Sequence, residues 1–244
     1  MDSLQLIKST LEDSLGQYGF EFYPFKIGWY NDMIKPIFQL NYSYDTVAFL
    51  IVSTPQMFDK AFKPFIWCHQ LSGSLNPVDE CTVYYLDRIK QAFPDTEIDI
   101  KYDFELHAGR RPKVLMQTAA HISGAAYYYQ RDDLREDPWG SNKKIFGVCI
   151  HPKYGGWFAL RGVAIFENFT CPHLTKIEPN DVVPEDKKRE LLEKFNYRWE
   201  DWSYRDIIPV AEKYSEEQKK YFATKPGQRH KLIDEIRNVD TFCI

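Results

Sequence analysis

The spacing of apolar residues along the chain predicts a mixture of helices and strands. Apolar side chains recur at intervals of three and four over residues 4–15, which is typical of an amphipathic helix, and Gly16 offers its end. Residues 46–53 form a continuous apolar and β-branched run, which is typical of a strand buried on both faces. Residues 20–27 predict another strand, and Pro24 within it favours an edge position.

The remaining pattern predicts further strands and several long helices. Alternating residues 97–104 predict a strand, and residues 147–151 and 157–166 predict two strands joined as a hairpin through Gly155 and Gly156. We therefore predict an α+β fold in which most strands are antiparallel. The predicted helices cover residues 54–67, 76–93, 113–129, 185–195 and 228–239, and a capping box at 215–218 begins another.

Composition and charge narrow the class of protein. Aromatic residues are abundant, with 17 Phe, 16 Tyr and 6 Trp, which suits either a large core or a pocket for a large flat ligand. The net charge of -4 argues against a nucleic-acid partner. No secretory signal follows Met1, and the longest tight apolar run, residues 47–52, is far shorter than the roughly 20 residues of a membrane helix. We expect a cytoplasmic protein without a membrane partner.

Cysteine and histidine give only weak patterns. Five Cys with irregular spacing do not resemble a disulfide framework, so we expect free thiols. Cys149 and His151 share a strand face, and so do Cys171 and His173, but this spacing is shorter than that of the usual zinc knuckle. We expect no metal site of the protein's own.

Two arginines stand among apolar or aromatic residues. Arg161 lies in a predicted strand and Arg205 in the aromatic string 202–206, so each needs an anionic or carbonyl partner. A guanidinium binds a carboxylate through two parallel hydrogen bonds, which makes both residues candidates for carboxylate recognition. An internal salt bridge, for example to Asp206 or Glu200, is the alternative.

Four groups of unusual sequence strings together resemble one known family. They are GFEFYPF and WYN within 19–31, RRPK, QTAAH and GAAYYYQ within 110–130, DPWG, GVCIHP and GGWF within 137–158, and WSYRD and YSEEQ within 202–218. Over nearly the whole chain these strings resemble the CblC (MMACHC) family of cobalamin-processing proteins. The resemblance implies a fold related to flavin-dependent nitroreductases, with an antiparallel sheet flanked by helices and a helical C-terminal region. It also implies one cobalamin-processing domain over residues 1–244, with a C-terminal helical segment from about 184 packed on it.

The resemblance implies a cyanocobalamin decyanase and alkylcobalamin dealkylase that transfers alkyl groups from cobalt to glutathione. The carboxylates of glutathione are expected to meet Arg161, Arg205 and Arg229, which are therefore the candidate catalytic residues. Met116 is bulkier than the small residue expected at its position. Cobalamin is expected base-off, its nucleotide tail displaced from cobalt, in a pocket that includes Asp103, Val114, Leu115, Met116, Gln117, Tyr128, Tyr129, Gln130, Cys149 and Leu160.

His121 begins an H-x-x-G string, which supplies the lower cobalt ligand in some B12-dependent enzymes. Ala119 stands where those enzymes place an orienting Asp, and the string lies inside a predicted helix. We therefore expect that His121 does not bind cobalt and that the lower axial position of cobalt has no ligand.

The resemblance also implies partners beyond the ligands. A CblD-type trafficking protein and methionine synthase are expected downstream, and the chain is expected to be a monomer or weak homodimer. The sequence stops at Ile244, before the long Pro/Ser-rich tail of some members, so we expect any role of that tail to be lost or dispensable. Two alternatives stay open: an FMN-dependent reductase of the nitroreductase type, and a non-catalytic cobalamin chaperone.

Overall fold

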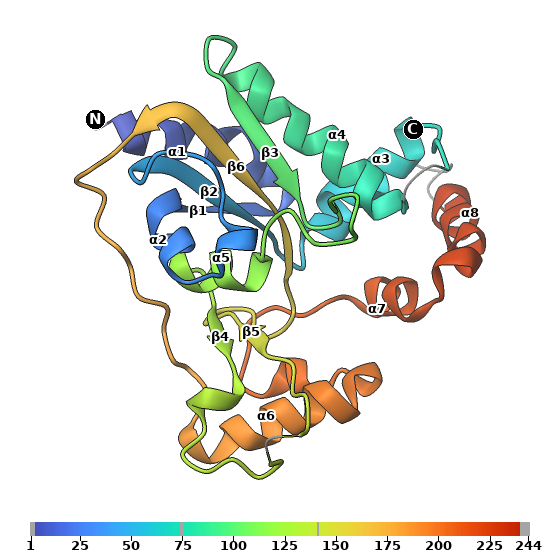
Figure 1. Ribbon diagram of the computed structural model, residues 1–244. Helices are drawn as coiled ribbons and strands as arrows, with labels where there is room; N and C mark the ends of the chain where they lie inside the picture. Colours follow the sequence, from blue (N-terminus) through green and yellow to red (C-terminus); the bar gives the residue numbers. More distant parts are fainter. Residues whose placement is uncertain (1–2, 74–75, 141, 240–244) are drawn as a thin grey trace. The chain divides into compact units, whose positions relative to one another are not determined.

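The computed structural model describes residues 3–73, 76–140 and 142–239 (Figure 1). Met1, on which the expectation about a signal depends, and Cys243 and Ile244 lie outside the described residues. The chain divides into two compact units, each built from segments far apart in the sequence. Unit 1 comprises residues 1–21, 53–95 and 214–244, and unit 2 comprises residues 22–52 and 96–213.

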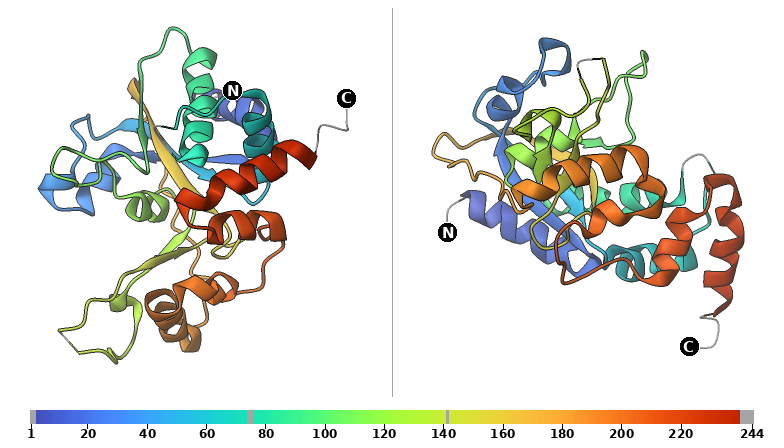
Figure 2. Two further views of the ribbon diagram at one scale, coloured as in Figure 1. Left: turned by 90° about the vertical axis from the view of Figure 1, so that its right-hand side faces the viewer. Right: turned by 90° about the horizontal axis from the view of Figure 1, so that it is seen from below.

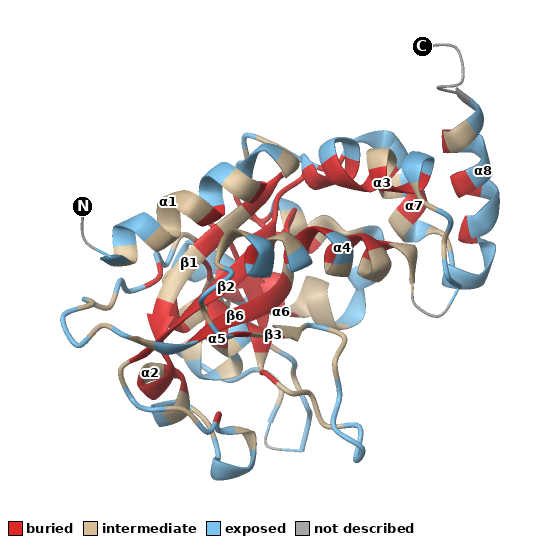
Figure 3. Ribbon diagram, turned by 90° about the horizontal axis from the view of Figure 1, so that it is seen from above, coloured by how far each residue is buried: buried red, intermediate tan, exposed pale blue. Residues whose placement is uncertain are grey.

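Unit 2 is built on a four-stranded sheet in the order β1-β2-β6-β3. β2 is buried along its whole length, as its continuous apolar run predicts (Figure 3), and β1 is an edge strand, as Pro24 predicts. β3 and β6 are antiparallel, with Ile98 opposite Phe166 and Tyr102 opposite Gly162. The strands are β1 (Phe20–Lys26), β2 (Thr46–Ser53), β3 (Ile98–Tyr102) and β6 (Ala159–Thr170).

One face of this sheet packs against α5 (Met116–Ile122). Ala119 and Ala120 of α5 join a buried cluster with Leu50 of β2 and Val163 of β6, and their small side chains let the helix backbone approach the strands. The start of α5 is fixed by α2 (Ile27–Asp32), because the hydroxyl of the buried Tyr30 accepts a hydrogen bond from the Leu115 amide at 2.9 Å.

A separate sheet pairs β4 (Tyr127–Tyr129) antiparallel with β5 (Val148–Ile150), and two predictions are wrong here. The helix expected over residues 113–129 ends at Ile122, because Gly124 adopts a left-handed φ of 75° and the chain continues as β4. The hairpin expected through Gly155 and Gly156 does not form, because β5 pairs with β4 while β6 lies between β2 and β3.

The β4–β5 pair packs against α6 (Glu185–Tyr197), which runs beside it in the views of Figures 1 and 2. Leu191 and Leu192 of α6 share a buried cluster with Tyr129 of β4 and Val148 of β5. This second core holds the elements that line the site described below.

Apart from the ends of β1 and β2, the regular structure of unit 1 is helical among its described residues. α1 packs against α4, which begins at Pro77 as predicted, and α8 carries its buried residues as a stripe (Figure 3). Ser215 caps α7 by accepting a hydrogen bond from the Gln218 amide at 3.2 Å, which is one half of the predicted capping box; the Gln218 side-chain oxygen does not complete the other half. The helices are α1 (Ser3–Leu15), α3 (Lys63–Cys68), α4 (Pro77–Ala92), α7 (Glu216–Ala223) and α8 (Arg229–Val239).

The helix expected from Thr54 to Trp67 begins later than predicted. The Thr54 amide donates to the Gly19 carbonyl at 2.9 Å, and the Thr54 carbonyl accepts from the Met57 amide at 3.1 Å and closes a turn. A turn of π-helix, Phe58–Phe62, then leads into α3. Thr54 therefore holds a turn and does not cap a helix.

Candidate functional site

Unit 2 contains two adjoining cavities of about 660 Å³ and about 160 Å³. Gln117, Gly147, Phe195 and Tyr204 line both of them. The larger is within the range of cavities that enclose drug-sized organic ligands. It is further lined by Tyr128, Gln130, Arg131, Asp132, Ile145, Phe146, Asn196 and Trp199, and the smaller one by Val148, Cys149, Gly156, Phe158, Leu160 and Arg205.

Half of the residues predicted to bind cobalamin line these cavities. Gln117 comes from α5, Tyr128 from β4, Gln130 from the position after it, Cys149 from β5 and Leu160 from β6. The fold therefore brings side chains from both sheets and one helix to one place, although they lie up to 43 positions apart in the sequence (160 − 117).

The other predicted cobalamin residues line neither of these cavities. Val114 and Met116 are buried in the cluster beneath α5, and Leu115 packs on the same cluster. Asp103 is exposed just after β3, and Tyr129 is fully buried. The bulk of Met116 therefore fills core space between α5 and the sheet.

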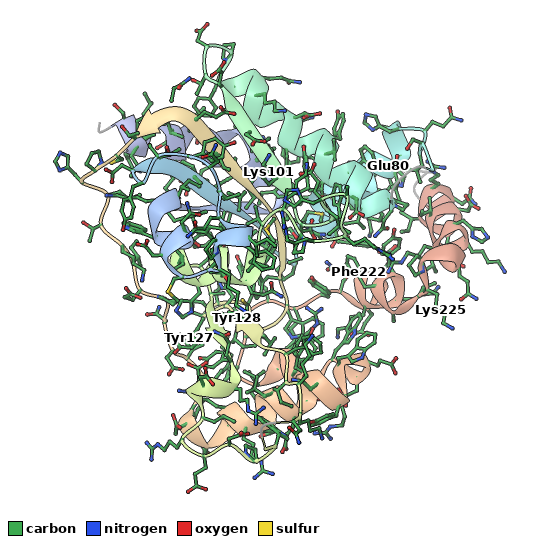
Figure 4. The ribbon with its side chains drawn as sticks, in the orientation of Figure 1. Glu80, Lys101, Tyr127, Tyr128, Phe222 and Lys225 are labelled. Atoms are coloured by element: carbon green, nitrogen blue, oxygen red, sulfur yellow. The ribbon has the colours of Figure 1, made fainter. Side chains whose placement is uncertain are left out.

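β4 alternates between the larger cavity and α6. Tyr128 and Gln130 line the cavity, whereas Tyr129 between them belongs to the buried cluster under α6; Figure 4 labels Tyr128 on this strand. The Tyr129 hydroxyl donates to Asp181 Oδ1 at 2.7 Å and accepts from the Val183 amide at 2.9 Å. Burial and the hydrogen bond to Asp181 raise the pKa of Tyr129, so its hydroxyl stays protonated.

Gly147 makes room for Tyr128 where the two cavities meet. A Cβ at this position would lie 2.6 Å from the Tyr128 ring and 2.7 Å from the Tyr129 carbonyl oxygen. The Tyr128 ring therefore lies against bare backbone just before β5, and a larger residue would displace it.

Two titratable side chains of this region are held neutral. Burial raises the pKa of the Cys149 thiol far above its ordinary value, and its Sγ lies 3.7 Å from the Gln117 carbonyl oxygen. Burial lowers the pKa of His121, whose Nδ1 accepts a hydrogen bond from the Tyr128 amide at 3.2 Å. Cys149 is therefore a thiol and not a thiolate, and His121 lines neither cavity.

Arg161 and Arg205 both belong to unit 2. Arg161 is 7% exposed on β6, next to Leu160, and its carbonyl accepts a hydrogen bond from the Asp103 amide at 3.2 Å. Arg205 lines the smaller cavity, and its Nη1 donates to the Gly156 carbonyl. Arg205 therefore presents a cation at the wall of a cavity.

Aromatic rings surround the Arg205 guanidinium. Its central carbon lies 5.5 Å from the ring centre of Trp157, 5.4 Å from that of Trp202 and 5.2 Å from that of Tyr204. Asp206, one of the two carboxylates named as alternative partners, accepts from the Trp157 indole at 2.7 Å and pairs with Lys213 at 2.8 Å. The rings hold the guanidinium in place and still leave it at the cavity wall.

Arg229 belongs to unit 1, where it is 9% exposed. Its Nε donates to the Thr224 carbonyl at 3.0 Å, its Nη1 to Asn76 Oδ1 at 3.2 Å and its Nη2 to the Phe222 carbonyl at 3.5 Å. It also lies 5.0 Å from the ring centre of Tyr221. These contacts tie the segment between α7 and α8 to the start of α4.

Sequence reasoning missed several residues of the larger cavity. Ile145, Phe146, Phe195, Asn196 and Trp199 all line it, from the loop before β5 and from the end of α6 onward. No local sequence pattern marked them, and only the structure shows that Phe146 and Trp199 are 57% and 56% exposed, although large aromatic side chains are usually buried.

Neither a metal centre nor a membrane span is found among the described residues. No three His, Cys, Asp or Glu side chains of the described ranges gather closely enough to hold a metal ion, and Cys68, Cys81, Cys149 and Cys171 form no disulfide bond among the described residues. None of the described helices is long and apolar enough to cross a membrane.

Comparison with known proteins identifies relatives over nearly the whole chain. The model of the methylmalonic aciduria and homocystinuria type C family matches residues 19–233. Two relatives bear the name cyanocobalamin reductase / alkylcobalamin dealkylase: that of Gallus gallus is 53% identical over 93% of this chain and 95% of its own, and that of Homo sapiens is 50% identical over 93% and 80%. The crystal structure of the Caenorhabditis elegans B12-trafficking protein CblC superposes with a TM-score of 0.85 at 32% identity, covering 98% of each chain.

Proposed function

Because this chain belongs to the methylmalonic aciduria and homocystinuria type C family, we propose that it binds cobalamin and removes its upper axial ligand. Its relatives are named for both halves of that activity, reduction of cyanocobalamin and dealkylation of alkylcobalamin. The proposal concerns cobalamin as substrate, which the cavities of unit 2 would hold.

The observation that carries the proposal is the composition of these cavities. Gln117, Tyr128, Gln130, Cys149 and Leu160 were predicted from the sequence as cobalamin contacts, and all five line the adjoining cavities. The larger cavity offers aromatic rings for the flat corrin and amide groups for its polar rim. The five other predicted residues remain proposed cobalamin-binding residues, although they line neither cavity: Asp103, Val114, Leu115, Met116 and Tyr129. They would lie behind or beside the residues that contact cobalamin.

Base-off binding is the form of the substrate that we propose. Because the Nδ1 of the neutral His121 accepts a hydrogen bond from the Tyr128 amide, its Nε2 carries the proton and has no lone pair for cobalt. The neutral Cys149 thiol is also a poor metal ligand, so neither offers cobalt a strong lower ligand. Loss of the donor nitrogen below cobalt makes Co(III) easier to reduce, which favours the release of cyanide.

Glutathione is the proposed acceptor of alkyl groups. Its thiolate attacks the carbon bound to cobalt, a carbon–sulfur bond forms, and the electron pair of the cobalt–carbon bond remains on cobalt as Co(I). A free thiol has a pKa of about 8.5, so a cationic site helps by favouring the thiolate, but holding sulfur in line with the bond contributes more. Arg161 and Arg205 are the proposed clamps for the glutathione carboxylates. The resemblance also implies Arg229, but its hydrogen bonds within unit 1 favour a role in stability, and the Arg229→Ala variant distinguishes the two roles.

A fold relationship to flavin-dependent nitroreductases and the use of FMN as a cofactor are secondary proposals. The fold contains an antiparallel β3–β6 pair with helices packed on the sheet, which is compatible with that relationship. FMN would then be one source of electrons for decyanation. The visible spectrum of the purified protein distinguishes a bound flavin from a bound corrinoid.

We also propose that the protein passes processed cobalamin onward and works in the cytoplasm as a monomer or weak homodimer. A CblD-type trafficking protein and methionine synthase are the proposed recipients. Residues 1–244 are proposed to act together as one cobalamin-processing domain. If the protein binds methylcobalamin but forms no thioether with glutathione, the chaperone alternative gains support over the enzyme.

The test is a spectrum of methylcobalamin with the purified protein, before and after glutathione is added. We expect a base-off shift on binding, and then a Co(I) or Co(II) spectrum together with S-methylglutathione. Free methylcobalamin with glutathione is the control. An unchanged spectrum at saturating protein would contradict the proposed function.

A further inference from the structure

α6 forms one wall of the larger cavity, and hydrogen bonds tie it near both ends to other elements of unit 2. The first tie is centred on Lys188, which is buried although it is charged. Its Nζ donates to Asp181 Oδ2 at 2.7 Å and lies 3.1 Å from Glu185. Asp181 Oδ1 accepts from the Tyr129 hydroxyl at 2.7 Å. One carboxylate therefore joins α6 to β4.

The second tie is near the end of the helix, at Asn196. Its Oδ1 accepts from the Phe146 amide at 2.8 Å, and its Nδ2 donates to the Phe146 carbonyl at 2.9 Å and to the Leu192 carbonyl at 2.8 Å. Asn196 therefore pairs with both polar groups of the Phe146 backbone. This fixes the far end of α6 to the loop that leads into β5.

The first tie holds the side of β4 that faces away from the cavity. Tyr128 and Gln130 line the cavity on either side of Tyr129, whose side chain points to α6. As long as Asp181 holds Tyr129, the cavity-lining side chains of β4 stay at a fixed spacing from the end of α6. Asp181 lines neither of the two cavities, so it would act only through its partners.

The chemistry of the tie keeps it formed near neutral pH. Burial acts to raise the pKa of Asp181, but the hydrogen bonds from Lys188 and Tyr129 outweigh it and the pKa is lowered. The hydrogen bond to Asp181 raises the pKa of Lys188. A fully buried hydroxyl such as that of Tyr129 is costly without a partner, which makes this geometry strongly preferred.

We propose that Asp181 is a positioning residue, which sets the spacing of β4 and α6 and so the width of the corrinoid-binding cavity. This inference rests on the proposed function, since it concerns the same cavity. A ligand that fills the cavity contacts both walls, so loosening the tie lowers affinity and leaves the groups around the reacting atoms in place.

The test compares Asp181→Asn and Lys188→Met, which removes the other charge of the tie, with the double variant, using methylcobalamin as the probe. Each single variant is expected to raise Kd and KM for methylcobalamin about tenfold while kcat with glutathione stays within about twofold. The double variant should be no weaker than the weaker single one, because both act through one tie. Glu178→Gln is the control, since it removes an exposed unit 2 pair with Lys176 at 2.9 Å and should change neither constant.

The outcomes separate this inference from the proposed function. If the wild-type protein binds methylcobalamin and both single variants retain its affinity within about twofold, the positioning role is excluded and the proposed function stands. If kcat and thermal stability fall together while KM is unchanged, Asp181 serves folding alone and the inference is overturned. If the wild-type protein gives no spectral shift, both fail.

Discussion

Arg205 in unit 2 and Arg229 in unit 1 both lie among aromatic rings, but their hydrogen bonds differ. The Arg205 guanidinium lines a cavity of about 160 Å³ and donates to the Gly156 carbonyl. The Arg229 guanidinium donates to two backbone carbonyls and to Asn76 within its own unit. The rings around the two are similar, at 5.2 Å from Tyr204 for Arg205 and 5.0 Å from Tyr221 for Arg229.

The difference shows that an aromatic setting does not by itself give an arginine a ligand. Rings hold the flat guanidinium in place in both units, so the use of the residue depends on where its donors point. The Arg205 guanidinium lies at a cavity wall, where a ligand would enter, whereas the Arg229 donors bond to Thr224, Phe222 and Asn76 within unit 1. The two arginines should therefore respond differently to the same substitution.

Replacing the unit 2 arginines should give the largest effect. If Arg205 and Arg161 bind the glutathione carboxylates as proposed, Arg205→Ala and Arg161→Ala each remove a charge-assisted partner, and KM for glutathione should rise on the order of 100-fold. The Kd of methylcobalamin should change less than about threefold, because neither guanidinium is needed to bind the corrin. Initial rates over a glutathione series, with Kd from absorbance titration, measure both.

Arg205→Lys separates charge from shape in this experiment. Lysine keeps the charge but cannot bind a carboxylate through two parallel hydrogen bonds, so it should restore only part of the glutathione use. An equal loss of methylcobalamin affinity and glutathione use in the Ala variants would contradict the clamp assignment.

The same substitution in unit 1 should reduce stability more than it changes glutathione use. Arg229→Ala leaves the Thr224 and Phe222 carbonyls and Asn76 without these donors, so the free energy of unfolding should fall by about 2–3 kcal/mol. Thermal unfolding measures this, and Asn76→Ala should reproduce a smaller part of it. An unchanged melting temperature together with a raised KM for glutathione would instead place Arg229 with Arg205 as a glutathione contact.

Local patterns predicted the elements of the large sheet and of the helical unit better than those of the site. The run 46–53 and Pro24 gave β2 and the edge strand β1 correctly, because burial on both faces and a missing amide donor are properties of the local sequence. The partner of β5 was predicted wrongly, since Gly155 and Gly156 suggested a hairpin. Strand pairing depends on distant residues, here those of β4.

The site shows the same limit at the level of side chains. Arg205 could be selected because a charge in an aromatic string is unusual in any sequence. Asn196 could not be selected from the sequence, because its structural role depends on two hydrogen bonds to the backbone of Phe146, which is 50 positions away. The predicted helix over residues 113–129 continued through Gly124, and only the left-handed turn there shows that Tyr128 belongs to a strand.

Gly147→Ala tests the difference between the two units by changing only the cavity of unit 2. The added Cβ would lie 2.6 Å from the Tyr128 ring, so the ring must move and methylcobalamin affinity should fall about tenfold. Gly227→Ala in unit 1 is the matched control, because nothing lies within 4 Å of a Cβ there and affinity should not change. Absorbance titration measures both, and unchanged affinity in Gly147→Ala would mean that Tyr128 does not contact the ligand.

The smallest effect concerns ion pairs in the two units at low pH. In unit 2, Lys188 is buried and pairs with Asp181, whose pKa is lowered from its ordinary value of 3.8. In unit 1, Lys220 and Glu235 pair at 2.9 Å, but their side chains are 62% and 60% exposed. Because Asp181 is itself partly exposed, its carboxylate should contribute only about 0.5–1 kcal/mol.

A group whose pKa is lowered on folding stabilises the protein above its unfolded pKa, and this contribution is lost as the pH falls through its folded pKa. The unfolding free energy of wild type minus that of Asp181→Asn should therefore be constant from about pH 7 to 5 and shrink below about pH 4. Glu235→Gln should show no measurable difference from wild type at neutral pH, because an exposed pair gains little over its solvated charges. Urea unfolding at a series of pH values measures both variants, and a difference for Asp181→Asn that grows as the pH falls would mean that its carboxylate is protonated in the folded protein.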